Sequence, residues 1–134
     1  MKVYSASFSI STKGEIDFVD ITSNLSRMVT DSGVRDGLVN VFAPHATGVI
    51  IITENEPRLL TDIRNVLEKL IPRGSSYSHP GNAHSHLRAV FLVPSKVIPV
   101  VRGRLALGTW QSVLFVETDP SSRHRTIIVQ VIGE

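Results

Sequence analysis

Three of the five histidines in this chain lie close together, in the polar segment 75–86. They are His79, His84 and His86, and the residues around them are mainly Ser, Gly, Pro and Asn, which favour turns and loops. Neutral imidazole is the commonest side-chain metal ligand and a natural general base near pH 7. The segment is therefore a candidate functional loop, with a solvated polar loop as the alternative interpretation.

A fourth histidine, His45, lies between two predicted strands. Residues 37–42 form the first strand, which Pro44 ends, and residues 48–53 form the second. The second strand, GVIIIT, is almost entirely β-branched, a pattern typical of a strand buried on both faces. His45 and Thr47 precede this buried strand, and both are candidate catalytic residues if the histidine loop lies nearby.

A long amphipathic helix is predicted over 57–71. Pro57 suits its first turn, and apolar residues recur every three or four positions along one face. Asp62 lies away from the centre of that face, so it is either a catalytic carboxylate or a surface acid paired with Arg58 one turn earlier. Glu54, before the helix, is a second candidate carboxylate.

Chain lengths indicate which of these residues can share one site. The strand 48–53 extends roughly 20 Å, at about 3.3 Å per residue. The helix 57–71 is roughly as long, at about 1.5 Å per residue. If the helix runs antiparallel to the strand, the segment 75–86 begins close to His45. The cluster predicted in this way comprises His45, His79 and His86, with His84 as an optional fourth member.

The carboxylates Glu54 and Asp62 lie nearer the other end of the strand. They can join the histidines only by a bent path or from a neighbouring subunit. Because the chain has no Cys, a bound metal would need histidine and carboxylate ligands. The metal-ligand set predicted on this basis is His45, His79, His86 and Glu54.

Composition and charge exclude several other classes of protein. The 134 residues suffice for one domain with a sizeable core, and the net charge is only +2. Lys and Arg are scattered, so no continuous basic surface for nucleic acid is expected, although Arg123 and Arg125 can face a phosphate. No apolar run is long enough to span a membrane, and Met1 leads directly into a strand-like segment. We expect a cytoplasmic protein.

The other predicted elements complete an α+β domain over residues 1–134. Residues 2–10 and 15–19 alternate apolar and polar side chains and predict a hairpin, and Thr22 is the expected cap of a helix that Gly33 ends. A short helix is predicted around 87–91, capped by Asn82 or Ser85. The strands predicted for the last third are 96–101, 105–107, 109–117 and 126–132. The total is about eight strands and two or three helices, with the helices packed on one side of largely antiparallel sheet.

Several short motifs, taken together in this order, make the chain similar to the YjbQ-like family, whose members are often described as secondary thiamine-phosphate synthase enzymes. The motifs are Pro44-His45-Ala46-Thr47-Gly48, Glu54-Asn55-Glu56, Asp62, Tyr77-Ser78-His79, Asn82-Ala83-His84-Ser85-His86-Leu87, Gly103-Arg104-Leu105-Ala106-Leu107-Gly108-Thr109-Trp110-Gln111, Glu117, Arg123 and Arg125. The resemblance runs through most of the chain, and the segment 103–111 is its most distinctive part.

The resemblance implies a β-sandwich-like α+β fold that assembles as a homotrimer, with a site at His45, His79 and His86. Trp110 and Gln111 then either line the site or belong to the core. The implied activity joins a pyrimidine-methyl diphosphate to a thiazole phosphate and releases pyrophosphate. The chain has no evident diphosphate cradle, so we expect this activity to be weak or secondary.

Two functional hypotheses follow. In the first, the histidines act on a phosphorylated small molecule, with or without a divalent metal such as Zn or Mg. Thr47 and Asp62 assist the histidines, and Arg123 or Arg125 binds the phosphate. In the second, the chain is a non-catalytic trimeric module that binds a phosphate ligand or a metal. Neither hypothesis involves nucleic acid or a membrane.

Overall fold

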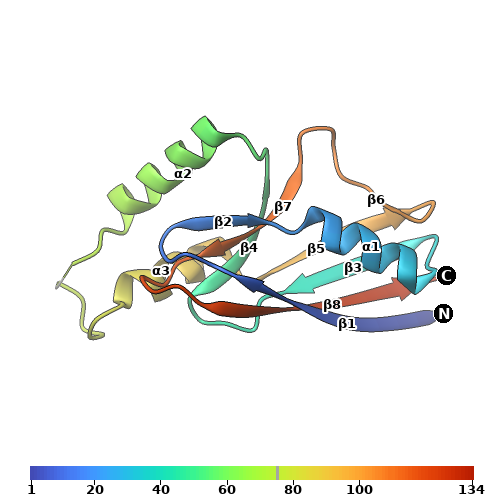
Figure 1. The fold of residues 1–134 in the computed structure, drawn as a ribbon, viewed down its shortest axis with the longest axis horizontal. Coiled ribbons are helices and arrows are strands. Elements are labelled where there is room, and N and C mark those ends of the chain that lie inside the picture. Colours follow the sequence, from blue (N-terminus) through green and yellow to red (C-terminus); the bar gives the residue numbers. More distant parts are fainter. Residues whose placement is uncertain (75) are drawn as a thin grey trace.

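The computed structural model describes residues 1–74 and 76–134, which form two antiparallel sheets and three helices (Figure 1). The five-stranded sheet has the strand order β1-β8-β3-β5-β6, and the three-stranded sheet has the order β2-β7-β4. In chain order the elements are β1 (Lys2–Ser11), β2 (Asp17–Asp20), α1 (Thr22–Ser32), β3 (Gly37–Phe42), β4 (Gly48–Thr53), α2 (Pro57–Leu70), α3 (Ala83–Leu92), β5 (Ser95–Val101), β6 (Arg104–Leu105), β7 (Ser112–Glu117) and β8 (His124–Gly133). The predicted α+β class is confirmed.

The two sheets enclose the main hydrophobic core. Side chains of β8 alternate between buried and exposed, and its buried residues pack in one cluster with Ile50 and Phe115 of the smaller sheet. Helix α1 contributes Leu25 and Val29 to the same cluster. A second, smaller cluster joins the three-stranded sheet to Leu67 of α2 and Ala89 of α3. All three helices therefore lie on one side of the five-stranded sheet, as predicted.

The predicted hairpin of the first two strands is wrong. β1 pairs with β8 along its whole length, from Lys2 opposite Gly133 to Ser11 opposite His124, whereas β2 pairs with β7 in the other sheet. Alternation of apolar and polar residues shows that a segment is a half-buried strand, but it does not select a partner. The turn at Gly14, which has φ +110°, leads the chain from one sheet to the other.

The helices α1 and α2 match their predicted ranges closely. Gly33 ends α1 in the left-handed conformation (φ +71°), but Thr22 is its first residue rather than its cap, and the carboxylate of Asp20 accepts a hydrogen bond from the Thr22 backbone N–H. Glu56 caps α2 by accepting from the backbone N–H of Arg58. The side chain of Arg58 forms an ion pair with the same residue, Glu56. The described part of the chain contains no ion pair between Arg58 and Asp62, the pair that the sequence offered as one interpretation of Asp62.

Two further expectations need correction. Helix α3 begins at Ala83, so His84 and His86 are helical residues and the histidine loop is shorter than predicted. Strand β7 begins only at Ser112, and Trp110 lies in the preceding turn, where it is 73% exposed rather than part of the core. None of the helices in the described residues is long and apolar enough to cross a membrane.

Candidate functional site

Three of the predicted histidines line two adjoining pockets at the end of the molecule where α3 begins. One pocket of about 430 Å³ is formed mainly by the segment before α3 and includes His79 and His86. The other, of about 240 Å³, lies between the β3–β4 loop and α3 and includes His45 and His86. His86 belongs to both pockets, so it shares one pocket with His79 and the other with His45.

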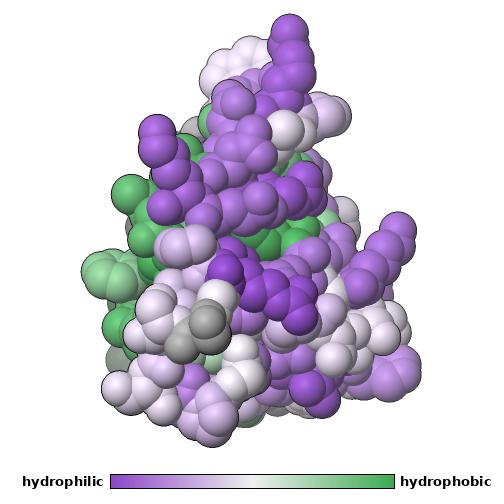
Figure 2. Space-filling view, turned by 90° about the vertical axis from the view of Figure 1, so that its left-hand side faces the viewer, coloured by the Kyte–Doolittle hydropathy of each residue, from purple (hydrophilic) through white to green (hydrophobic). Residues whose placement is uncertain are grey.

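The rings of His79 and His86 lie next to each other. Their centroids are 4.8 Å apart and their planes are inclined by 51°. Apolar residues of α3 line both pockets: Leu87, which is 37% exposed, lies in the first, and Val90, which is 72% exposed, lies in the second. Figure 2 views the molecule from this end and shows apolar surface beside and between the polar side chains. The pockets are therefore open apolar hollows in which imidazoles supply polar groups.

His45 is held by the backbone of β8. Its Nε2 lies 2.9 Å from the carbonyl oxygen of Thr126 and 3.2 Å from the Thr126 nitrogen, and its ring packs edge-on against Phe115. When Nε2 carries the proton, it donates to the carbonyl and leaves Nδ1 with a free lone pair. Burial lowers the pKa of His45; the contact with Thr126 opposes this, and the charge of Arg125 adds to it. The lowered pKa favours the neutral imidazole, which is the form that can accept a proton.

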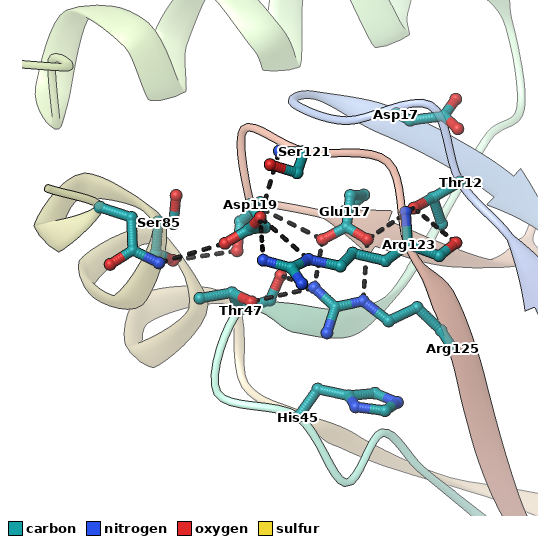
Figure 3. Close-up of polar contacts among 12 residues, drawn as sticks. Thr12, Asp17, His45, Thr47, Ser85, Glu117, Asp119, Ser121, Arg123 and Arg125 are labelled. Carbon is teal, nitrogen blue, oxygen red and sulfur yellow. Dashed lines mark hydrogen bonds and ion pairs between the residues drawn. The ribbon is translucent and has the colours of Figure 1, made fainter.

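Behind His45 lies a buried ion pair between Arg125 and Glu117 (Figure 3). Arg125 donates to both carboxylate oxygens of Glu117, at 2.8 Å from Nε and 2.5 Å from Nη2. The same Nη2 lies 2.9 Å from the hydroxyl and 3.1 Å from the carbonyl of Thr47. Glu117 also accepts from the hydroxyl of Thr12. Thr47 and Arg125, two predicted site residues, therefore hold the β3–β4 loop against β7 and β8.

A second ion pair links the same region to α3. Asp119 accepts two hydrogen bonds from the guanidinium of Arg123 and one, at 3.1 Å, from the side chain of Asn82, the residue before α3. The hydroxyl of Thr118 donates to the carbonyl of Ser85. Burial raises the pKa of Asp119, but hydrogen bonds from Ser121, Asn82 and Arg123 outweigh it and hold the pKa below its ordinary value. These contacts fix the first turn of the helix that carries His86.

His84 has a different role from its neighbours. It is fully buried, and its Nε2 lies 3.0 Å from the carboxylate of Glu15, which also pairs with Arg73 and Arg88. Its Nδ1 has no hydrogen-bond partner among the described residues. Arg88 is also buried and donates to the carbonyl of Ile71. His84 therefore ties α3 to the β1–β2 connection and does not line either histidine pocket.

The predicted carboxylates lie apart from the histidines. Glu54 and Asp62 are exposed and line neither histidine pocket. Among the residues that the structure describes, no three His, Asp or Glu side chains are grouped closely enough to hold a metal ion. One chain thus supplies a pair of imidazoles but does not provide the predicted metal-ligand set of His45, His79, His86 and Glu54.

Sequence reasoning did not identify the partly buried Glu15, the buried Asp119 or the buried Arg88, and it gave Glu117 no role. Each has ordinary neighbours in the sequence, and several of the contacts come from distant segments: Thr12 and Glu117 are 105 residues apart, and Glu15 and Arg88 are 73 apart. One signal was present, because Glu117 ends a strand whose residues 113–116 are all apolar.

The whole chain resembles known proteins. The family model for the UPF0047 protein YjbQ-like family matches residues 6–134. A UPF0047 protein of Methanothermobacter thermautotrophicus is 45% identical over 137 residues, which cover 100% of this chain and 95% of that protein. The crystal structure of a YbjQ-like protein from Sulfolobus solfataricus P2 has a TM-score of 0.94 at 37% identity and covers 99% of both chains. A YjbQ/UPF0047 protein of Clostridium acetobutylicum has a TM-score of 0.90 at 38% identity, covering 95% of this chain and 99% of that one. The chain therefore belongs to the YjbQ-like UPF0047 family.

Proposed function

We propose that the two histidine pockets bind a phosphorylated small molecule and that their imidazoles transfer protons during its conversion. The observation that carries this proposal is the position of His86, which lines both pockets with His79 in one and His45 in the other. Concave apolar surfaces with a few convergent polar groups are the usual binding sites for small molecules. The pockets have this character.

His45 is the proposed general base. A base must be unprotonated at working pH and must have a free lone pair. The lowered pKa of His45 favours the first condition, and the tautomer that donates from Nε2 to the Thr126 carbonyl meets the second at Nδ1. His86 and His79 are the proposed partners that bind the substrate and return the proton. Thr47 supports the site indirectly, because both of its oxygens accept from Arg125.

Arg123 is the better candidate of the two arginines for a phosphate contact. Its side chain is 51% exposed, and Nε and Nη2 are the nitrogens that bind Asp119. Arg125 is only 8% exposed and its guanidinium is engaged by Glu117 and Thr47. An exposed guanidinium with free donors suits a phosphate, which takes bidentate hydrogen bonds.

The first reaction to test is thiamine-phosphate formation from the pyrimidine-methyl diphosphate and the thiazole phosphate, as a weak or secondary activity. Purified protein is compared with His86→Ala and His79→Ala variants. The fifth histidine, His124, is exposed and lines neither histidine pocket, so His124→Ala is the matched control. We expect at least a tenfold loss in His86→Ala and none in His124→Ala, because positioned acid–base groups contribute about 10²–10⁴-fold.

The outcomes separate the two functional hypotheses. If His86→Ala keeps the full rate, the acid–base proposal fails. If the wild type binds either substrate saturably but forms no product, the chain is a binding module, the second hypothesis. Calorimetric titration of each substrate, with and without His86→Ala, gives this answer independently of turnover.

A divalent metal such as Zn or Mg stays a prediction. His79 and His86 can supply two ligands, but the described residues of one chain supply no third His, Asp or Glu nearby. We therefore assign the metal no step in the reaction. Elemental analysis of protein purified without an affinity tag tests for the metal. If metal is present at near one ion per chain and is lost in both His79→Ala and His86→Ala, the result supports a site completed by another subunit or by a ligand.

We also propose that the chain assembles as a homotrimer. The outer face of the five-stranded sheet exposes apolar side chains on four neighbouring strands, namely Val3, Leu38, Val97, Ile128 and Ile132. Contiguous apolar patches of this kind are typical of interfaces between proteins. Light scattering should give three times the chain mass for the wild type and a smaller mass for Val97→Lys. A wild-type monomer at all concentrations would contradict the trimer.

A further inference from the structure

A basic groove lies at the opposite end of the molecule from the histidine pockets. Two adjoining pockets of about 370 and 400 Å³ share Thr30, Gly103 and Arg104, and they lie between α1 and the turn that joins β5 to β6. Figure 1 shows this turn and α3 at opposite ends of the five-stranded sheet. The groove includes the start of the distinctive segment 103–111, which the histidine site does not use.

The charge of the groove is one-sided. The charged residues that line it are Arg35, Arg102 and Arg104, and the carboxylate of Asp36, which accepts from the Arg102 N–H, is not part of this lining. None of the three arginines forms an ion pair within the described part of the chain, whereas Arg58, Arg73, Arg88, Arg123 and Arg125 all do. Three like charges that share one hollow repel one another, and a bound anion removes that cost.

The backbone holds these arginines close together. The Gly103 N–H donates to the carbonyl of Arg35 at 2.8 Å, and the Arg102 N–H donates to the carboxylate of Asp36 at 3.3 Å. Arg102 and Gly103 both have positive φ, at 53° and 76°, which folds the turn back sharply. Nη1 of Arg35 lies 3.7 Å from the position that a Cβ on Gly103 would take, so this guanidinium packs against the turn.

The opposite wall is the hydroxyl-bearing face of α1. Thr22, Ser26 and Thr30 are spaced four residues apart, so they share one side of the helix, and all three line the groove. The hydroxyl of Thr30 donates to the Ser26 carbonyl, and that of Thr22 accepts from the Val113 N–H. Ser26 is exposed, so its hydroxyl is accessible to a ligand in the groove.

We propose that this groove binds the phosphate or diphosphate group of a small molecule, as a site separate from the histidine pockets. Guanidinium groups and an accessible hydroxyl are the donors that phosphate oxygens prefer. A small ligand is favoured over a nucleic acid because the arginines line a compact hollow and do not form an extended basic stripe.

The test is calorimetric titration of the full chain with inorganic pyrophosphate and with inorganic phosphate at low and moderate salt. We expect saturable binding that weakens at least tenfold in Arg104→Gln, since a charge-assisted bidentate contact is lost. Arg27→Gln is the matched control, because Arg27 is an exposed arginine of the same helix that lines neither pocket of the groove. It should change the affinity less than twofold.

Ser26→Ala should weaken binding by a smaller factor, and His86→Ala should leave it unchanged, so failure of the histidine proposal does not affect this one. Absence of saturable binding would overturn the anion site. Equal losses in Arg104→Gln and Arg27→Gln would also overturn it, because they would reflect overall charge alone. If a short single-stranded oligonucleotide binds more tightly than pyrophosphate and depends on Arg104, the small-molecule assignment is wrong.

Discussion

Replacing Arg125 with Met should destabilise the fold far more than the same replacement at Arg123. Arg125 is 8% exposed and makes four hydrogen bonds, two to Glu117 and two to Thr47, and Glu117 is fully buried. Arg125→Met leaves the Glu117 carboxylate with only the Thr12 hydroxyl and the Asp119 N–H as donors. Removing one partner of a buried pair costs about 3–5 kcal/mol, because the remaining charge is uncompensated.

Arg123→Met is the matched control on the same segment of the chain. Arg123 is 51% exposed and pairs with Asp119, which is only 4% exposed but keeps hydrogen bonds from Asn82 and from the Ser121 N–H, so the expected loss is smaller, about 1–2 kcal/mol. The free energy of unfolding is measured by urea denaturation at a single protein concentration, because the proposed trimer would make stability depend on concentration. A domain of this size has about 5–15 kcal/mol in total, so the expected loss in Arg125→Met is easily measured.

A double-mutant cycle with Glu117→Leu shows whether the pair itself is responsible. When both charges are absent, no uncompensated charge remains, so the double variant should be more stable than the sum of the single changes predicts, by about 1–3 kcal/mol. Equal losses in Arg125→Met and Arg123→Met would refute the reasoning. Strictly additive effects of Arg125→Met and Glu117→Leu would refute it as well.

Three further predictions concern pH and packing. The pKa of Asp119 is lowered in the folded state, so its contribution to stability is complete above the ordinary aspartate pKa and is lost as pH falls through the lowered value. In thermal unfolding, the stability of Asp119→Asn should therefore fall less steeply across this acid range than that of the wild type. The pKa of His45 is also lowered, so its protonation opposes folding below the ordinary histidine pKa. NMR titration should find His45 neutral at pH 7, and a raised pKa would contradict its proposed role as base. A Cβ on Gly48 would collide with the buried ring of Phe115, so Gly48→Ala should cost about 1–3 kcal/mol in urea unfolding, and an unchanged midpoint would show that the ring moves freely.

Local patterns in the sequence predicted most of the elements, because the physics of each element is local. The run 48–53 is a strand in the structure at the predicted bounds, since its β-branched residues suit a buried sheet. Pro57 and the apolar face after it predicted α2 to within one residue of its end. The length of this strand and helix also predicted correctly that the chain returns to His45.

The histidines show where local reasoning ended. His84 and His86 are two residues apart, and on a helix such residues point to nearly opposite sides. One is therefore buried against Glu15 while the other lines both pockets. A loop would have imposed no such division, so the separate roles of these two histidines depend on α3 beginning at Ala83.

Fold class, the ranges of most helices and strands, and the return of the chain from α2 towards His45 followed from composition, periodicity and chain length. The tertiary structure decided which strands pair, which charges are buried and which side chains reach the pockets. Those features depend on contacts between distant segments, as when β1 pairs with β8 and Glu15 binds Arg88. A charged residue looks the same in the sequence whether it meets water or a buried partner, because only folding determines its surroundings.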